Sequence, residues 1–229
     1  MVQWDLRNRP AHTQKNLPDP CANLFFDKEG AKVLGPITKT YSYKLYEQGQ
    51  IVGIKFKPAG LCHFTPEPMT TFTDHYIQPT FLFSHWEHSV PKKVQAADSL
   101  DEAVAILEPL LLAQKIITNQ KIKLANDIIS FIKTSSGINQ VQQVTDYFRL
   151  NIRTLQRMFE RYIGINPKWI IRKYRLHDVL DKAERDTQDW LSASLALGYT
   201  EQSHFIKDFK ELVGVTPSVY RSLKSQSSD

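Results

Sequence analysis

Cysteine is scarce in this sequence of 229 residues, and the two that occur, Cys21 and Cys62, form no CxxC pair. Two cysteines supply neither the disulfide framework of a small secreted domain nor the ligands of a cysteine-rich zinc site. We therefore expect a protein of a reducing compartment. Its length suits one large or two modest domains, each with a core of its own.

Long apolar runs are also lacking. One of the longest, residues 103–113, is interrupted by Glu108 and Pro109 and is shorter than the ~20 residues that cross a bilayer. The opening residues, MVQWDLRNR, contain no apolar stretch of the kind found in signal peptides. The sequence predicts a cytoplasmic protein without a membrane segment.

Enzyme motifs are missing as well. The sequence contains no GxSxG, Walker or GxGxxG pattern, so we predict no enzyme activity and no cofactor. His85-x-x-His88 is a poor metal signal without neighbouring thiols or carboxylates. We interpret the histidines of residues 61–92 as loop or core residues, and we predict no metal site.

Positive charge is present in excess, but only in one half. Residues 1–120 contain 12 Lys and Arg against 12 Asp and Glu, whereas residues 121–229 contain 17 against 12. The whole net charge of +5 therefore belongs to the second half. This asymmetry favours a polyanion as the partner of that half.

Residues 1–98 have the composition of a β-rich domain. Short runs rich in β-branched and aromatic residues predict strands at 23–26, 32–34, 40–46 and 50–56. Residues 47–50 predict a hairpin turn between the last two, with Gly49 at positive φ. In the last run Val52, Ile54 and Phe56 alternate with polar or small residues, so one face is apolar. We expect a small antiparallel sheet or a partial barrel.

A helical linker is predicted at residues 99–120, between domains at 1–98 and 121–229. Ser99 is expected to cap its helix, and Pro109 is expected to kink or split it. Packing on its own sheet and service as a dimer contact both remain open. The expected apolar stripe consists of Leu100, Val104, Leu107 and Leu111.

The second half contains one pattern written twice. Five positions of the first copy return 50 residues later with a residue of the same kind, which predicts a repeated supersecondary unit. The matched pairs are Leu155 and Phe205, Phe159 and Phe209, Gly164 and Gly214, Ile165 and Val215, and Pro167 and Pro217.

The first copy predicts a helix-turn-helix. Helices are expected at 122–133 and at 139–147, the latter with Asn139 as its cap. A turn at 149–151 and a helix at 152–162 capped by Asn151 follow. In that last helix Leu155, Phe159 and Tyr162 form a buried stripe. The opposite face contains Arg153, Gln156, Arg157 and Glu160, and such Arg and Gln side chains can read base edges in a major groove.

The second copy repeats the arrangement. Helices are expected at 189–197 and 201–213, with a turn at Gly198-Tyr199 and Thr200 as the cap. The second helix buries Phe205, Phe209 and Leu212 and exposes Gln202, Ser203, Ile206, Lys207 and Lys210. Gly214, Thr216 and Pro217 then predict a helix end and a new helix that reaches residue 223.

A long helix is expected between the copies. Gly164 ends the first unit, Asn166 caps the next helix and Pro167 occupies its first position. About 18 residues to residue 184 give roughly 27 Å of helix. Two recognition helices at that separation can enter major-groove segments about one DNA turn, roughly 34 Å, apart.

Residues 196–221, ALGYTEQSHFIKDFKELVGVTPSVYR, resemble the C-terminal motif of AraC/XylS-type transcription regulators. Leu155–Phe159 with Gly164 and Pro167 resembles that family's first unit, and the resemblance covers about 121–224. It implies an α+β chain whose second domain has seven helices, two helix-turn-helix motifs and double-stranded DNA as its partner. By position, Arg153, Gln156 and Arg157 match the family's first base-reading face, and Gln202, Ser203 and Lys207 match the second. We predict that Thr154, Arg161, Ile206 and Lys210 also bind DNA.

The second unit departs from the family pattern. Ala193-Ser194 stands where Ile-Ala is usual, and Lys207 stands where Arg is frequent. Lys binds phosphate as a point charge and cannot fork onto a base as Arg does. Ile206 could contact a thymine methyl group. We expect the first unit to carry more sequence specificity than the second.

In the first half, Gly53–Gly60 is similar to a motif of small, reduced cupin-like domains attached to some regulators of this family. This resemblance implies a role in sensing or dimerisation, so a small-molecule effector, a homodimer and RNA polymerase are the further expected partners. Two other hypotheses stay open: a DNA-targeted enzyme or metal-binding cupin-like protein, and an adaptor whose first half binds another protein.

Overall fold

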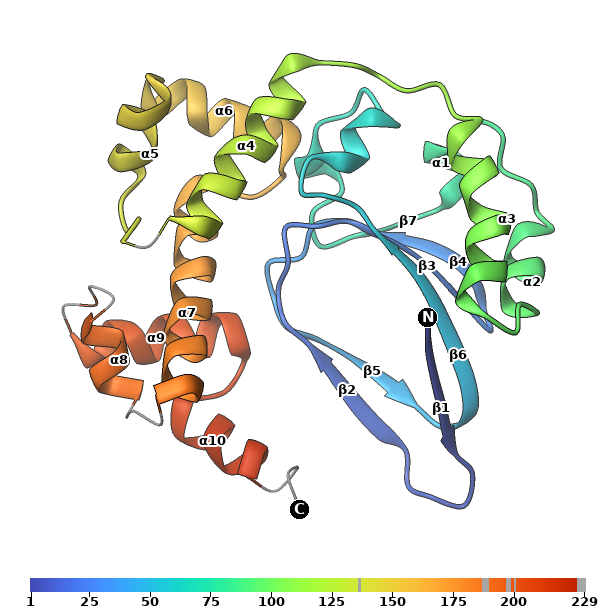
Figure 1. Cartoon of the computed structure of the whole chain (residues 1–229), viewed down its shortest axis with the longest axis horizontal. Coiled ribbons are helices and arrows are strands. Elements are labelled where there is room, and N and C mark those ends of the chain that lie inside the picture. Colours follow the sequence, from blue (N-terminus) through green and yellow to red (C-terminus); the bar gives the residue numbers. More distant parts are fainter. Residues whose placement is uncertain (136, 187–189, 197–198, 200, 226–229) are drawn as a thin grey trace.

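The computed structural model describes residues 1–135, 137–186, 190–196, 199 and 201–225 of the chain. A β-rich N-terminal domain lies beside a helical C-terminal domain, and the chain crosses between them through residues 115–119, which have no regular secondary structure (Figure 1). The predicted α+β class, with the sheets before the helices, is confirmed.

The N-terminal domain is built from short strands followed by short helices. Its strands are β1 (Val2–Leu6), β2 (His12–Asn16), β3 (Asn23–Asp27), β4 (Gly30–Leu34), β5 (Tyr41–Leu45), β6 (Glu47–Lys55) and β7 (Tyr76–Ile77). Its helices are η1 (Gly60–His63), η2 (Met69–Thr71), α1 (Pro79–Leu82), α2 (Val90–Gln95) and α3 (Leu100–Leu112).

The strands form an antiparallel five-stranded sheet in the order β1-β6-β3-β4-β7 and a separate pair, β2-β5. Neither sheet closes into a barrel, in agreement with the predicted sheet or partial barrel. Leu24 pairs with Val33 and Ile54 on its two sides, and Phe26 pairs with Val52. Leu24, Phe26, Val33 and Val52 are buried, since alternate residues of neighbouring strands share one face.

The hairpin predicted around residues 47–50 is wrong. β5 pairs with β2 and β6 pairs with β1 and β3, so the two strands on either side of residue 46 are not partners. The positive φ belongs to Glu47, at 56°, and not to Gly49. Gly49 serves close approach instead, because a Cβ there would lie 2.5 Å from the ring of Trp4 on β1.

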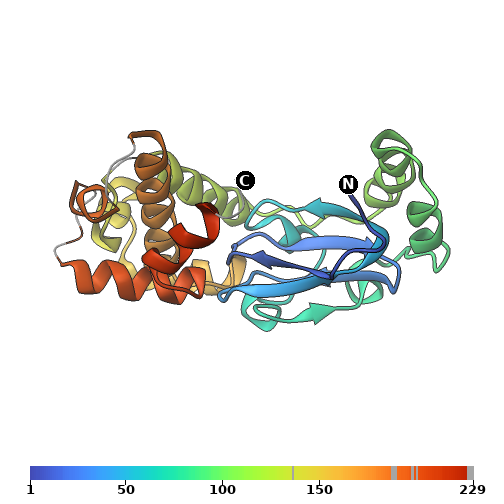
Figure 2. The ribbon, with the colours of Figure 1, turned by 90° about the horizontal axis from the view of Figure 1, so that it is seen from below.

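Helix α3 begins as predicted, with the Ser99 side chain accepting from Glu102 N. It does not split at Pro109, because that residue lies on the exposed face, where the carbonyl of Ala105 that loses its partner can meet water. The predicted apolar stripe is rotated: Leu100 and Val104 are exposed, and the inward residues are Ala103, Leu107 and Leu110. α3 packs against α2, and both lie on the side of the sheet away from the C-terminal domain (Figures 1 and 2).

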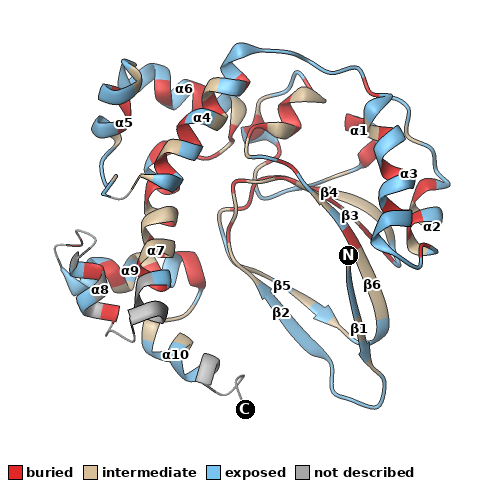
Figure 3. Ribbon diagram, viewed as in Figure 1, coloured by how far each residue is buried: buried red, intermediate tan, exposed pale blue. Residues whose placement is uncertain are grey.

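Seven helices make up the described part of the C-terminal domain. They are α4 (Gln120–Thr134), α5 (Val141–Phe148), α6 (Ile152–Tyr162), α7 (Pro167–Asp186), α8 (Trp190–Ala196), α9 (Gln202–Val213) and α10 (Pro217–Ser225). Figure 3 shows buried positions gathered where α4, α6 and α7 meet.

Most predicted helix signals lie where expected. Asn151 accepts from Thr154 N at 2.7 Å, and Asn166 accepts from Trp169 N at 2.9 Å. Gly164 and Gly214 have φ of 80° and 83°, each just past a recognition helix. The cap of α5 is Gln140 and not the predicted Asn139, and Glu201 is the residue before α9. The predicted roles of Gly198 and Thr200 lie outside the described residues.

The two domains share one continuous apolar core, which runs from Ala22 in the sheet to Val213 in α9. At the junction η2 packs against α6. Gly164 sits so close to η2 that an added Cβ would lie 2.4 Å from Thr73 Oγ1 and 2.8 Å from Met69 O. The exit of the first helix-turn-helix is therefore part of the domain interface.

We predict that Gly164→Ala destabilises the protein more than Gly137→Ala. Both glycines have positive φ, which costs an alanine about 1–2 kcal/mol. A Cβ at Gly137 meets nothing within 4 Å, whereas one at Gly164 collides with η2 and should cost about 1–3 kcal/mol more. Urea unfolding of the two variants measures the difference, and equal losses would mean that the interface imposes no constraint at Gly164.

Candidate nucleic-acid interface

Helix α6 presents a polar face to solvent. Leu155, Met158 and Phe159 are buried against the domain core and fix the helix rotation. The opposite side is exposed, as predicted, and contains Arg153, Thr154, Gln156, Arg157 and Glu160. This spacing of i, i+3, i+4 and i+7 puts two guanidinium groups and one amide on a single strip.

Arg161 lies differently from the other predicted DNA-binding residues of α6. Its guanidinium donates to the carbonyl oxygen of Pro66, in the N-terminal domain. The side chain is exposed but already has a partner in the neighbouring domain. Arg161 therefore connects the domains in this structure.

A groove runs between α6 and the N-terminal domain. Its volume is about 710 Å³, and Thr154 and Arg157 line one wall while Pro68 and Thr70 line the other. The exposed polar strip of α6 is thus bordered by η2 and the residue before it. A duplex that docks on α6 would meet this edge of the N-terminal domain.

Helix α9 is the equivalent helix of the second unit. Phe205, Phe209, Leu212 and Val213 are buried. Four of the predicted DNA-binding residues are exposed: Gln202, Ser203, Lys207 and Lys210. Ile206 was predicted to be exposed and is only partly so, because its side chain packs against the apolar core.

Arg172 of α7 holds α9 in place. Its Nη2 lies 2.7 Å from Asp208 Oδ1 and 2.7 Å from Glu211 Oε2, on successive turns of α9. The Arg172 side chain is only 21 % exposed, so water screens this contact less than a surface ion pair. Hydrogen bonding from Arg172 lowers the pKa of Glu211 below its usual range.

A cleft with a volume of about 560 Å³ lies between the two units, and its lining combines cations with the carboxylates of Asp208 and Glu211. Lys168 and Arg175 of α7 face His204 and Lys207 of α9 across it, and the α5 cap Gln140 completes one end. Sequence reasoning missed Lys168 and Arg175, because they lie on the connecting helix and outside both helix-turn-helix patterns. Cations in such a cleft suit the phosphates between two major-groove segments.

The N-terminal domain has a cavity of its own, of about 700 Å³, between β1, β5, β6 and α2. Trp4, Tyr43 and Tyr46 supply aromatic walls, and Gln50 and Gln95 supply amides. The polar groups are held in place: Gln50 Nε2 donates to Gln95 O at 2.7 Å, and Tyr43 donates to the buried Asp27 at 3.2 Å. Burial raises the pKa of Tyr43 to about 12, so this hydroxyl keeps its proton.

Neither histidine of the HxxH pair takes part in a cluster. His85 and His88 are exposed, and within the described ranges no three His, Cys, Asp or Glu side chains gather as a metal site. No helix in the same ranges combines the length and apolar character that crossing a membrane requires.

Two family models match separate parts of the chain. One, described as a helix-turn-helix domain, matches residues 144–222, which cover both units and α7. The C-terminal half therefore contains a helix-turn-helix domain. The other model, described as a domain of unknown function (DUF6597), matches residues 1–78.

A curated relative of this helix-turn-helix domain is distant. An uncharacterised HTH-type transcriptional regulator of Haemophilus influenzae is 25% identical over 99 residues, which are 43% of this chain and 33% of that protein. The chain thus matches about a third of that relative's length.

Among solved structures, apo ToxT from Vibrio cholerae strain SCE256 has a TM-score of 0.46 at 13% identity, covering 96% of this chain and 95% of that one. ToxT from Vibrio cholerae O395 has a TM-score of 0.45 at 14% identity, covering 92% of each chain.

We predict that Arg172→Ala loosens the second unit of the helix-turn-helix domain. Asp208 and Glu211 would lose their shared cation, which should cost about 1–2 kcal/mol of unfolding free energy. Because the pKa of Glu211 is lowered in the folded state, its contribution is present above its ordinary pKa of 4.5 and lost as the pH falls through the folded value.

Urea unfolding of wild type and Arg172→Ala from pH 7 down to acid tests this, since the variant should lose part of that acid dependence. Lys123→Ala is the control, because its pair with Asp127 is exposed and should be worth little. An Arg172 variant as stable as the Lys123 variant would show that the ion pair does not position α9.

Proposed function

We propose that this protein is a sequence-specific DNA-binding transcription regulator that reads two successive major-groove segments with α6 and α9. The observation that carries the proposal is the exposed strip of Arg153, Gln156 and Arg157 on α6 of an AraC-type domain. Arg can form two hydrogen bonds to guanine, and Gln can do the same to adenine. The positive charge of residues 121–229 supports binding to the phosphates.

The two units have different tasks in this proposal. α6 supplies two arginines and a glutamine, which suits direct reading of bases. α9 supplies Lys207 and Lys210, and its apolar Ile206 is partly withdrawn into the core. With Lys168 and Arg175 in the adjoining cleft, the second unit is suited to hold the DNA backbone.

Arg157→Ala should weaken binding to the preferred site by about 1–3 kcal/mol and relax discrimination at one base pair, because a forked contact to a base is lost. Electrophoretic mobility shifts on a selected site, its single-base variants and random DNA measure this. Arg9→Ala in the N-terminal domain is the control for loss of one exposed positive charge. An equal loss on random DNA would reduce Arg157 to a phosphate contact.

The N-terminal cavity is the proposed effector site of this regulator. Aromatic walls beside fixed amides and a carboxylate suit a small polar molecule with one flat apolar face. Lys28 Nζ lies 4.2 Å from the centre of the Tyr46 ring, so a positive charge lies against this wall of the cavity. Binding here would reach the DNA-binding half through the shared core.

A compound that binds this cavity should raise the melting temperature of the wild-type chain and lose that effect in Tyr46→Ala. A free compound concentration of ~100 times its Kd raises the free energy of unfolding by about 2.7 kcal/mol. Tyr76→Ala is the matched control, since Tyr76 is also an exposed tyrosine but lies outside the cavity. A compound that stabilises wild type and Tyr46→Ala equally would place the effector elsewhere.

RNA polymerase and a second copy of the chain are the further partners of this proposal, and no enzyme activity is part of it. The rival, a metal-dependent or DNA-targeted enzyme, predicts a stoichiometric metal in the purified protein that His85→Ala and His88→Ala remove. A finding of that kind would favour the rival.

A further inference from the structure

Both recognition helices are followed by a glycine of positive φ, Gly164 and Gly214, at equivalent positions. The last carbonyls of a helix lack partners inside the helix and need other donors. Gly164 N donates to Phe159 O at 2.8 Å, and Gly214 N donates to Lys210 O at 2.9 Å. These bonds close the last turns but supply no donor to the carbonyls of Tyr162 and Leu212. These two residues occupy equivalent positions 50 residues apart.

Both of these equivalent carbonyls accept a hydrogen bond from the N-terminal domain. Cys62 Sγ lies 3.3 Å from Tyr162 O, and Thr40 Oγ1 lies 3.0 Å from Leu212 O. Cys62 belongs to η1, and Thr40 belongs to the loop before β5, so the donors come from separate parts of one domain. Burial raises the pKa of Cys62 to about 12, so its thiol keeps the proton that it donates.

Further contacts tighten each attachment. At the first unit, Thr73 Oγ1 lies 2.9 Å from Gly164 O and 3.1 Å from Met69 O. At the second unit, a Cβ on Gly214 would lie 3.5 Å from Thr40 Oγ1, an ordinary van der Waals distance. The first attachment is therefore tightly packed and the second depends more on its hydrogen bond.

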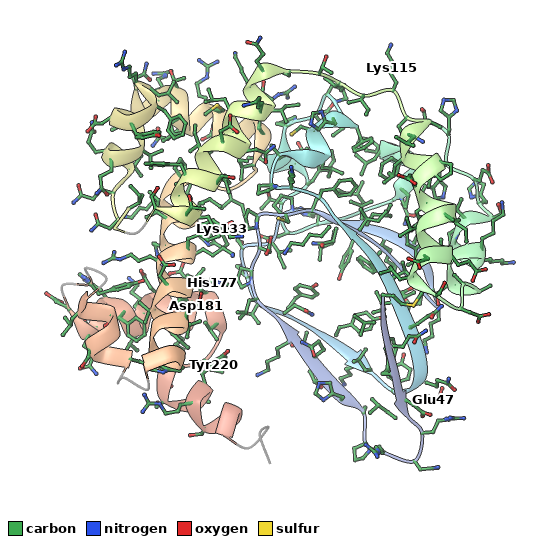
Figure 4. All side chains as sticks on the ribbon, viewed as in Figure 1. Glu47, Lys115, Lys133, His177, Asp181 and Tyr220 are labelled. Atoms are coloured by element: carbon green, nitrogen blue, oxygen red, sulfur yellow. The ribbon has the colours of Figure 1, made fainter. Side chains whose placement is uncertain are left out.

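The interface is continuous between the two attachment points. Leu17 and Pro18 of the N-terminal domain enclose a small cavity with Leu176, His177 and Leu212. Lys173 is 6 % exposed on the same side of α7, and burial lowers its pKa. Figure 4 shows His177 on α7 and Lys133 on α4 on the side of the helical domain that faces the N-terminal domain.

We propose that Thr40 and Cys62 are positioning residues, through which the N-terminal domain braces both recognition helices and sets the spacing of the two DNA half-sites. The inference rests on the proposed function. The physical reason is that a helix shift of one base-pair step, about 3.4 Å, changes the preferred gap. Contacts from the N-terminal domain at the C-terminal end of each recognition helix resist such a shift.

The test uses the full chain. Selection from a random DNA library first gives the wild-type site, expected as two sequence blocks with one preferred gap. Affinities are then measured on that site and on sites whose gap is one or two base pairs longer or shorter. The variants are Thr40→Val, which removes the donor at nearly constant shape, and Thr40→Ser, which keeps it.

Thr40→Val should lose about fivefold in affinity at the preferred gap and little at the neighbouring gaps, because one hydrogen bond no longer favours a single helix placement. Thr40→Ser should behave as wild type. Thr13→Val is the control, since Thr13 is an exposed threonine on β2. Cys62→Ala tests the other attachment independently and should relax the gap in the same way.

An equal loss at every gap would mean that Thr40 serves stability alone, and an unchanged or tighter affinity at every gap would mean that it does not position α9. Either result overturns the brace while the function stands. A wild-type chain that selects no two-block site would instead overturn the proposed function itself.

Discussion

The packing of α7 is the constraint on which the rest of the structure depends. Its 20 residues give about 30 Å of helix, and different sides of it serve different neighbours. Near its start, Trp169 and Ile170 are buried in the core shared with α4 and α6. Arg172 points to α9, while Lys173 and His177 face the N-terminal domain. Rotating this helix would disturb all three sets of contacts together.

Local signals made much of the C-terminal domain predictable. Asn151, Gly164, Asn166 and Pro167 each act on backbone groups within five residues, so their effect can be derived from the sequence without knowing the fold. The bounds of α6 follow from them. The same holds for Ser99 at the start of α3, where the capping contact spans three residues.

Pairing between distant segments could not be derived in this way. β6 lies between β1 and β3, which are remote from it in sequence. The residues near position 49 contain no signal that predicts these strand partners. The local sequence therefore predicts a turn at Gly49, although its missing side chain makes room for Trp4. The rotation of α3 has a similar cause, because the surface that it covers is made by α2 and not by its own residues.

The candidate site shows the same division between local and distant causes. A helical pattern predicts which side of α6 is exposed, because Leu155 and Phe159 define the inside. The pattern does not predict that Arg161 donates a hydrogen bond to Pro66, or that Ile206 packs inward, because both contacts depend on segments that meet only in the folded chain. Lys168 and Arg175 became candidates only when the cleft brought them beside α9.

The glycines that follow the two recognition helices, Gly164 and Gly214, show how local and tertiary causes can act at one residue. Each ends a recognition helix through a positive φ, which is a local effect visible in the sequence. At Gly164 the missing side chain also lets η2 approach the backbone, which is a tertiary effect. Because one residue meets both demands, its substitution by alanine conflicts with helix termination and domain contact together. The first unit is consequently coupled to the N-terminal domain by packing, and the second mainly by the hydrogen bond of Thr40. A rearrangement of the N-terminal domain would therefore carry α6 with it more directly than α9, which would change the distance between the two helices.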